Sequence, residues 1–89
     1  MALKRGDVVV IVASGELGKP RPAVVVQANE LGDATTTVLV SPITSDLTER
    51  LPIRPFVEPS PATGLRLRSQ IMVDKTLVLR RERIRSVIG

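Results

Sequence analysis

Histidine and cysteine are both absent from the 89 residues of this sequence. Without cysteine there can be no disulfide framework and no thiolate metal site. Without histidine the chain lacks the commonest acid/base group and the commonest metal ligand, and a serine–histidine triad is excluded. We therefore expect no zinc chemistry, and any catalysis must use Arg, Lys, Asp, Glu, Ser or Thr. No cofactor is expected.

Aromatic residues are nearly absent as well, because Phe56 is the only one. Valine, isoleucine and leucine must then supply the core, and β-branched residues favour strands. A chain of this length forms one domain, residues 1–89, with a small core that often depends on a partner subunit.

The charge balance is mildly basic, with 13 Lys and Arg against 9 Asp and Glu and a net charge of +4. Such a surplus suits a polyanionic partner without requiring one. The start, residues 1–7, lacks the long apolar core of a signal peptide, and no apolar run approaches the length of a membrane span. We expect a cytoplasmic protein with no membrane contact.

Short runs of β-forming residues separated by turn signals predict a mostly β fold, a small barrel or sandwich. The expected strands are Val8–Val12, Ala23–Gln27, Thr35–Val40, Ile53–Val57, Gln70–Asp74, Thr76–Leu79 and Ile84–Ile88. The expected breaks are the glycine-containing stretch 14–18, a helical turn at Asp46–Glu49, the loop Glu58–Gly64, an interruption at Asp74-Lys75 and a charged turn at 80–83. The last strand also has apolar residues at helical spacing, but its shortness favours a strand.

The run Val8–Val12 is continuously apolar, as in a strand that is buried on both faces. It offers more apolar surface than one face of a small barrel needs. Part of it is therefore predicted to lie at a subunit contact.

Arg21 stands between Pro20 and Pro22, directly before an apolar run. Each proline fixes its own φ and biases the preceding residue toward extended geometry, so the backbone presents this arginine rigidly. A guanidinium held in this way suits a phosphate. The plain alternative is a solvated arginine in a loop that enters a strand.

A second loop offers hydroxyls and a carboxylate, in Ser41, Thr44, Ser45 and Asp46. A guanidinium beside a hydroxyl can cradle a phosphate, since the cation neutralises charge and the hydroxyl adds a directed hydrogen bond. Ser-Pro and Thr-Ser sequences are also common turn formers. Asp74-Lys75 could add an acid/base pair, but such a pair is most often a solvated turn.

Taken together, Arg5-Gly6-Asp7-Val8, the run Lys19–Gln27 and Ser41-Pro42-Ile43-Thr44-Ser45 resemble the MazF/PemK/Kid family of toxins. Further matching stretches follow in the same order at Gly64-Leu65, Ser69–Asp74, Arg83-Ile84 and Val87–Gly89. The resemblance covers nearly the whole chain.

The resemblance implies an SH3-like β-barrel that forms a homodimer and cuts single-stranded RNA at short sequence motifs without a metal. It also implies a cognate antitoxin protein that covers the substrate groove. By the same match Arg21 and Thr44 are the expected catalytic residues. RNA contacts are predicted at Lys19, Gln27, Ser41, Ser45, Asp74 and Lys75.

The chain departs from the family pattern at several places. Some members have a histidine in the first loop and an arginine two residues before the acid at the strand end, where this chain has Met72. Asp74 matches that acid, but Lys75 stands where glutamine is common. The sequence ends at Gly89, where relatives usually continue into a C-terminal helix, so that helix is expected to be missing.

Cleavage by attack of the RNA 2′-hydroxyl requires stabilisation of charge on phosphorus and two proton transfers. Arg21 suits the first role and is a candidate proton donor, whereas a guanidinium that stays protonated is a poor base. Thr44 would orient a phosphoryl oxygen, and the general base is left open.

Recognition of RNA bases usually relies on aromatic stacking, for which this chain has only Phe56. Arg80, Arg81, Arg83 and Arg85 either extend a phosphate track or form a solvated tail. Two other functions fit the same residues: a non-enzymatic toxin of the same fold that binds a protein such as a topoisomerase, and a small basic RNA-binding module.

Overall fold

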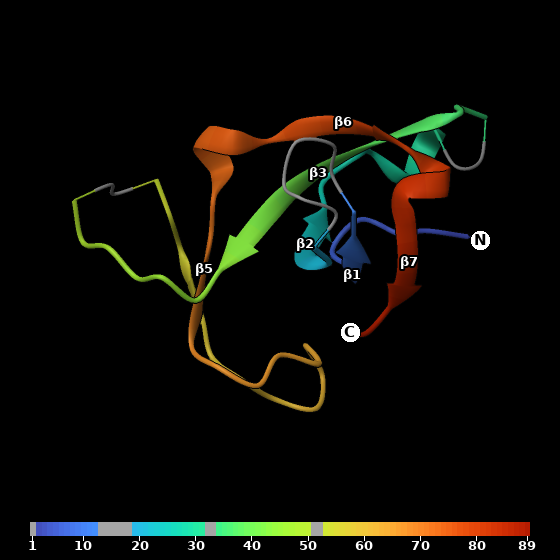
Figure 1. Cartoon of the computed structure of the whole chain (residues 1–89). Coiled ribbons are helices and arrows are strands. Elements are labelled where there is room, and N and C mark those ends of the chain that lie inside the picture. Colours follow the sequence, from blue (N-terminus) through green and yellow to red (C-terminus); the bar gives the residue numbers. More distant parts are fainter. Residues whose placement is uncertain (1, 13–18, 32–33, 51–52) are drawn as a thin grey trace.

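The computed structural model describes residues 2–12, 19–31, 34–50 and 53–89, and these form a mostly β structure (Figure 1). The strands are β1 (Val8–Ile11), β2 (Arg21–Val25), β3 (Thr37–Thr44), β4 (Phe56–Val57), β5 (Ser69–Ile71), β6 (Leu77–Arg80) and β7 (Ile84–Val87). Three 3-10 turns, η1 (Asn29–Leu31), η2 (Val73–Lys75) and η3 (Arg81–Arg83), are the helical elements of the described ranges, and none could cross a membrane. The mostly β prediction is confirmed.

All strand pairs are antiparallel, in the order β4-β5-β3-β2-β1-β7, and β6 also pairs with β3. The longest strand, β3, pairs with β6 along its first half, with β2 at its centre and with β5 at its end. Figure 1 shows β3 running across the molecule, with β6 along its start and β5 near its tip. One strand thus joins the core to the end of the sheet that carries the loops.

One apolar cluster fills the space that β1, β2, β3, β6 and β7 enclose. Its buried members are Val9, Ile11, Ala23, Val25, Val38, Val40, Leu79 and Ile84. Residues at every second position of β2 and of the first half of β3 belong to it, as the strand period requires. All of these side chains are aliphatic, which the aromatic-poor composition predicted.

The first strand is buried almost completely within a single subunit. Val8, Val9 and Ile11 are each less than a tenth exposed, and Val10 and Val12 are half-buried. The prediction of a strand covered on both faces is therefore confirmed. Most of the apolar surface of this strand is buried within one subunit. Its apolar sequence therefore does not support the predicted subunit contact.

The third strand continues beyond its expected end at Val40 and passes through Pro42 to Thr44. Proline cannot donate to a ladder and is usually restricted to strand edges or irregular positions. Pro42 lies between the part of β3 that pairs with β6 and the part that pairs with β5. Its carbonyl still accepts a hydrogen bond from the Met72 N–H at 2.8 Å, so the strand continues there without the missing donor.

The helical turn expected at Asp46–Glu49 is wrong, because Asp46 and Glu49 form bends and the two residues between them have no regular structure. The Asp46 N–H donates to Thr44 Oγ1 at 3.0 Å, and the Thr48 N–H donates to the buried Gln70 Oε1 at 2.6 Å. These side-chain acceptors replace the acceptors that a helical turn would provide. The expected break at residues 14–18 lies outside the described residues.

The remaining sequence signals match the structure in part. Of the edge strand expected at Ile53–Val57, only Phe56–Val57 form β4, at the end of the sheet, so Pro55 lies outside the strand. The strand expected at Gln70–Asp74 is β5, which begins at Ser69 and ends at Ile71. The interruption at Asp74-Lys75 is η2, the charged turn is η3, and the final segment is β7, a strand.

The turn before Leu65 packs directly on the C-terminal residues. Gly64 has φ +70°, its N–H donates to Ser60 O at 3.0 Å, and a Cβ added there would overlap the Ile88 carbonyl. An isolated bridge between Ser60 and Leu65 closes the turn. A side chain at position 64 would therefore be strained and would also clash.

We expect Gly64→Ala to reduce the free energy of unfolding more than Gly6→Ala does. Gly6 also has a positive φ, +95°, but an added Cβ would meet nothing within 4 Å there. The control variant, Gly6→Ala, should thus lose about 1–2 kcal/mol of stability because of its left-handed backbone. Gly64→Ala should lose that amount and a further amount because of the clash. Urea unfolding of both variants measures the difference, and equal losses would contradict the packing argument.

A two-pronged ion pair fastens the segment before β4 to η2. The Arg54 guanidinium donates through Nε and Nη2 to the two carboxylate oxygens of Asp74, both at 2.9 Å. These hydrogen bonds hold the pKa of Asp74 below its ordinary value and raise the pKa of Arg54. The geometry is the planar fork that arginine favours with carboxylates.

This ion pair predicts a pH-dependent contribution to stability. Because the folded-state pKa of Asp74 lies below the ordinary 3.8, the contribution is present above that pH and is lost as the pH falls through the lowered value. Thermal unfolding should show Asp74→Asn to be less stable than the wild type at pH 7, with the gap closing in acid. Glu82→Gln is the control, since its pair with Arg80, at 3.5 Å, is highly exposed and should contribute little.

Candidate active site

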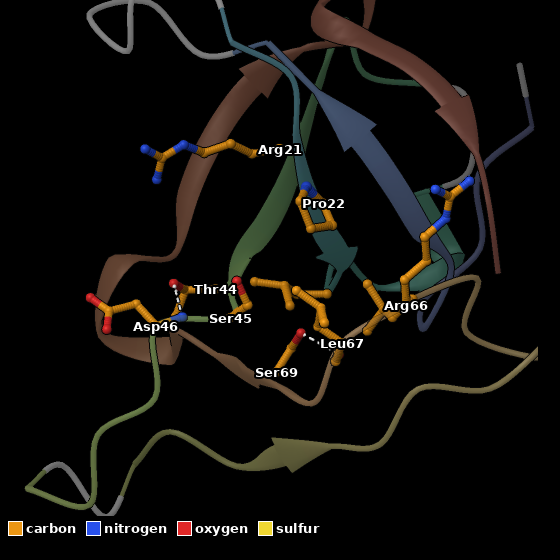
Figure 2. Close-up of a pocket in the computed structure, with 10 residues that line it drawn as sticks. Arg21, Pro22, Thr44, Ser45, Asp46, Arg66, Leu67 and Ser69 are labelled. Carbon is orange, nitrogen blue, oxygen red and sulfur yellow. Dashed lines mark hydrogen bonds between the residues drawn. The ribbon is translucent and has the colours of Figure 1, made fainter.

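A pocket of about 360 Å³ opens where the start of β2 meets the end of β3 (Figure 2). The segment that leads into β5 forms its other wall. The residues lining it are Arg21, Pro22, Ile43, Thr44, Ser45, Asp46, Leu65, Arg66, Leu67 and Ser69. The pocket combines two guanidinium groups, hydroxyls, one carboxylate and an apolar wall.

The β2–β3 register brings Arg21 and Thr44 together. Ala23 pairs with Pro42 and Val25 pairs with Val40. The ladder ends at this Ala23–Pro42 pair, so Arg21 and Thr44 each lie two residues beyond it, at the same end of the two strands. Both side chains line the pocket that opens there.

Backbone pairing also fixes the start of β2. Arg21 and Pro22 pair with Ile11 and Val10 of β1. The proline-bracketed segment is therefore strand rather than loop, which differs from the expectation that the strand begins at Ala23. Arg21 itself is exposed, so a rigid backbone carries a solvent-accessible guanidinium.

Thr44 is half-buried, and its hydroxyl oxygen already accepts a hydrogen bond from the Asp46 N–H. A threonine hydroxyl retains one hydrogen to donate when its oxygen accepts. The Asp46 N–H thus orients Thr44 toward a donor role. In the view of Figure 2, Arg21, Thr44 and Asp46 lie on one side of Pro22, while Arg66 lies on the other.

The structure groups three of the predicted residues in this pocket, namely Arg21, Thr44 and Ser45. Lys19 is exposed and precedes β2, but it does not line the pocket. Gln27 lies beyond the opposite end of β2. There its Oε1 accepts from the Leu39 N–H and its Nε2 donates to Thr35 Oγ1, so the amide serves the fold.

Ser41, Asp74 and Lys75 also lie away from the pocket lining. Ser41 is 1% exposed and hydrogen-bonds to Thr76 Oγ1 at 2.6 Å, beside a second, apolar pocket. Asp74 is held by Arg54, and Lys75 ends η2 with its side chain exposed. These residues do not join Arg21 and Thr44 in one site.

Sequence reasoning missed Arg66, which lines the pocket between Leu65 and Leu67. The signal was the alternation Leu65-Arg66-Leu67-Arg68 directly after Gly64. Such alternation usually indicates a strand with one polar face. Here the alternating residues lie outside a strand, directly before β5. The sequence predicted that Asp46 lies in the second loop but indicated no catalytic or binding function for it.

The donor set of the described residues contains no group of three or more carboxylates placed to hold a metal ion. Asp46 is the carboxylate of the pocket lining, and the groups around it are cationic, hydroxylic or apolar. The lining therefore offers positive charge from arginine, hydroxyl groups and an apolar surface, which together suit an anion with an organic portion.

Comparison with known proteins agrees with this chemistry. Residues 4–89 match the family described as PemK-like, MazF-like toxins of type II toxin–antitoxin systems. A protein of Mycolicibacterium smegmatis described as a probable endoribonuclease MazF is 38% identical over 88 residues, which are 98% of this chain and 80% of that protein. The chain belongs to the PemK-like, MazF-like family of type II toxins.

Proposed function

We propose that this toxin is a metal-independent endoribonuclease that cuts single-stranded RNA at short sequence motifs. The observation that carries the proposal is that Arg21, at the start of β2, and Thr44, at the end of β3, line one open pocket. The name of the Mycolicibacterium smegmatis relative supports the same activity. The pocket suits a phosphodiester because it offers positive charge and a directed hydroxyl donor.

In the proposed reaction the RNA 2′-oxygen attacks the adjacent phosphorus and the bond from phosphorus to the 5′-oxygen breaks. The products are a 2′,3′-cyclic phosphate and a 5′-hydroxyl end. Negative charge grows on the non-bridging oxygens as the transition state forms. Arg21 stabilises that charge, and a preorganised donor of this kind is worth roughly 10²–10³ in rate.

Thr44 holds a non-bridging oxygen through its hydroxyl hydrogen, because its own oxygen accepts from the Asp46 N–H. Arginine is too weak a base to take the proton of the 2′-hydroxyl. Asp46 supplies a carboxylate in the same pocket, whereas Asp74 is engaged by Arg54. We assign proton acceptance to Asp46 and proton donation to Arg21.

The family description implies an antitoxin, and the proposed partner is a cognate protein that covers this pocket. Two exposed arginines at the pocket make an acidic segment the fitting occupant. The toxin would act in the cytoplasm, where its RNA substrate and its antitoxin are made.

The proposed assembly is a homodimer. Its support is two exposed valines rather than β1. Val78 of β6 is 61% exposed and Val73 of η2 is 47% exposed. A second copy of the chain would cover them.

Sedimentation at micromolar concentration should therefore give the mass of a dimer. Val78→Glu should shift the population to monomer, because burying an unpaired carboxylate in the contact is unfavourable. Val87→Glu on β7 is the matched control, as this valine is 44% exposed on a different strand. A folded wild-type monomer at this concentration would contradict the dimer.

The cleavage proposal predicts graded losses when the pocket is changed. Arg21→Ala should lower the cleavage rate by about 100-fold or more, since it removes the charge stabilisation. Thr44→Val should lower the cleavage rate roughly tenfold, whereas Thr44→Ser keeps the hydroxyl and most of the activity. Asp46→Asn should bind RNA but cleave it much more slowly.

The assay is incubation of a mixed-sequence single-stranded RNA with each variant in EDTA, followed by mapping of the product ends. Cleavage that leaves 5′-hydroxyl ends supports the mechanism, and RNA binding without cleavage by the wild type refutes it. Full activity of Asp46→Asn would refute the assignment of proton acceptance to Asp46.

A further inference from the structure

The pocket has a second cation on the wall opposite Arg21. Arg66 is exposed and lines the pocket between Leu65 and Leu67, and in Figure 2 it lies across Pro22 from Arg21. One phosphodiester carries one negative charge, and Arg21 with Thr44 is proposed to bind it. Arg66 is therefore a candidate ligand for a second anion.

Three other arginines of the described residues form ion pairs with carboxylates. Arg54 pairs with Asp74, Arg68 with Glu58 at 2.6 Å, and Arg80 with Glu82. Among the described residues no carboxylate pairs with Arg66. Its guanidinium is thus available to an anion that enters the pocket.

The wall that carries Arg66 is rigidly built. The preceding residues form a closed turn in which Gly64 packs on the Ile88 carbonyl and Ser60 pairs with Leu65. The following residue pair, Leu67 and Ser69, is tied by a hydrogen bond from the Ser69 hydroxyl to the Leu67 carbonyl at 2.9 Å. A cation on a fixed wall loses little freedom when it binds a ligand.

The pocket lining also has an apolar part. Pro22, Ile43, Leu65 and Leu67 contribute to its lining, and Leu67 is 63% exposed although it is large and aliphatic. Aliphatic side chains and a proline ring can pack against the face of a nucleobase in a chain that has a single aromatic residue. The volume of about 360 Å³ is at the lower end for small-ligand sites, which suits one nucleotide rather than several.

We propose that Arg66 binds the phosphate next to the scissile one, so that the pocket holds one nucleotide between two arginine-bound phosphates. This inference rests on the proposed function. It adds the binding of a second phosphate by Arg66 and the position of the nucleotide between the two phosphates. Arg66 acts on substrate binding, and Arg21 with Thr44 acts on the bond that breaks.

The first test measures the salt dependence of binding. The probe is a 2′-O-methyl RNA, which cannot undergo attack by its own 2′-oxygen, so binding is read whether or not the protein cleaves RNA. Loss of one phosphate contact lowers the slope of log K against log salt by about 0.7 for a single strand. Arg66→Gln should show this decrease, and Arg68→Gln should not, although both remove one positive charge.

The second test uses cleavable short RNAs that contain the mapped cleavage site and differ by one phosphate on either side of it. For the wild type the added phosphate should raise kcat/KM on one side only. Arg66→Gln should abolish that gain, with a raised KM and little change in kcat, while Arg68→Gln should keep it.

Equal salt slopes for the two variants, or an undiminished phosphate gain in Arg66→Gln, would overturn the assignment. Absence of cleavage by the wild type would refute the proposed function instead, and the binding slopes would still decide the role of Arg66.

Discussion

The antiparallel pairing of β2 with β3 is the constraint on which the rest of this structure depends. The ladder carries core residues, such as Ala23 and Val40, and Arg21 and Thr44 each lie two residues beyond its last pair, which is Ala23 with Pro42. Burial of the aliphatic cluster therefore fixes the ladder, and the ladder fixes the two polar groups at its end. A slip by one residue would move every β2 side chain to the opposite face, so selection for the core also maintains the site.

A small domain without aromatic residues in its core gains limited stabilisation from burial. The structure adds polar ties at its periphery, where the sheet narrows to short strands. The buried Gln70 is one, since its amide group hydrogen-bonds to the backbone at Thr48 and at Arg54. The Arg54–Asp74 ion pair is another, and it holds the same segment from the other side. These ties set the position of β4 and of the loop after Thr44 without enlarging the core.

Much of this architecture could be predicted from sequence because it follows from local periodicity. Runs of β-branched residues gave the strands, and prolines and charged clusters gave the edges and turns. The extension of β3 through Pro42 could not be predicted in this way. It depends on a change of neighbouring strand at that residue, which is a property of the topology.

The site was predictable where one ladder connects its residues and unpredictable where it does not. Arg21 and Thr44 come from consecutive long strands, so their meeting follows from pairing. Gln27 and Ser41 sit on or next to the same strands, yet their side chains serve the fold. Arg66 reaches the pocket through a turn whose position is set by the C-terminal residues, and no local pattern encodes that contact.

The packing of Gly64 on Ile88 has a dynamic consequence. The C-terminal residues are themselves held to β1, since the Ile88 N–H donates to Val8 O at 2.7 Å and the Val8 N–H donates to Gly89 O at 2.9 Å. Detachment of this end would release the turn that bears Leu65 and Arg66. Fraying of the chain end and loosening of the pocket wall are thus one opening event, and amide hydrogen exchange would report a common free energy for both.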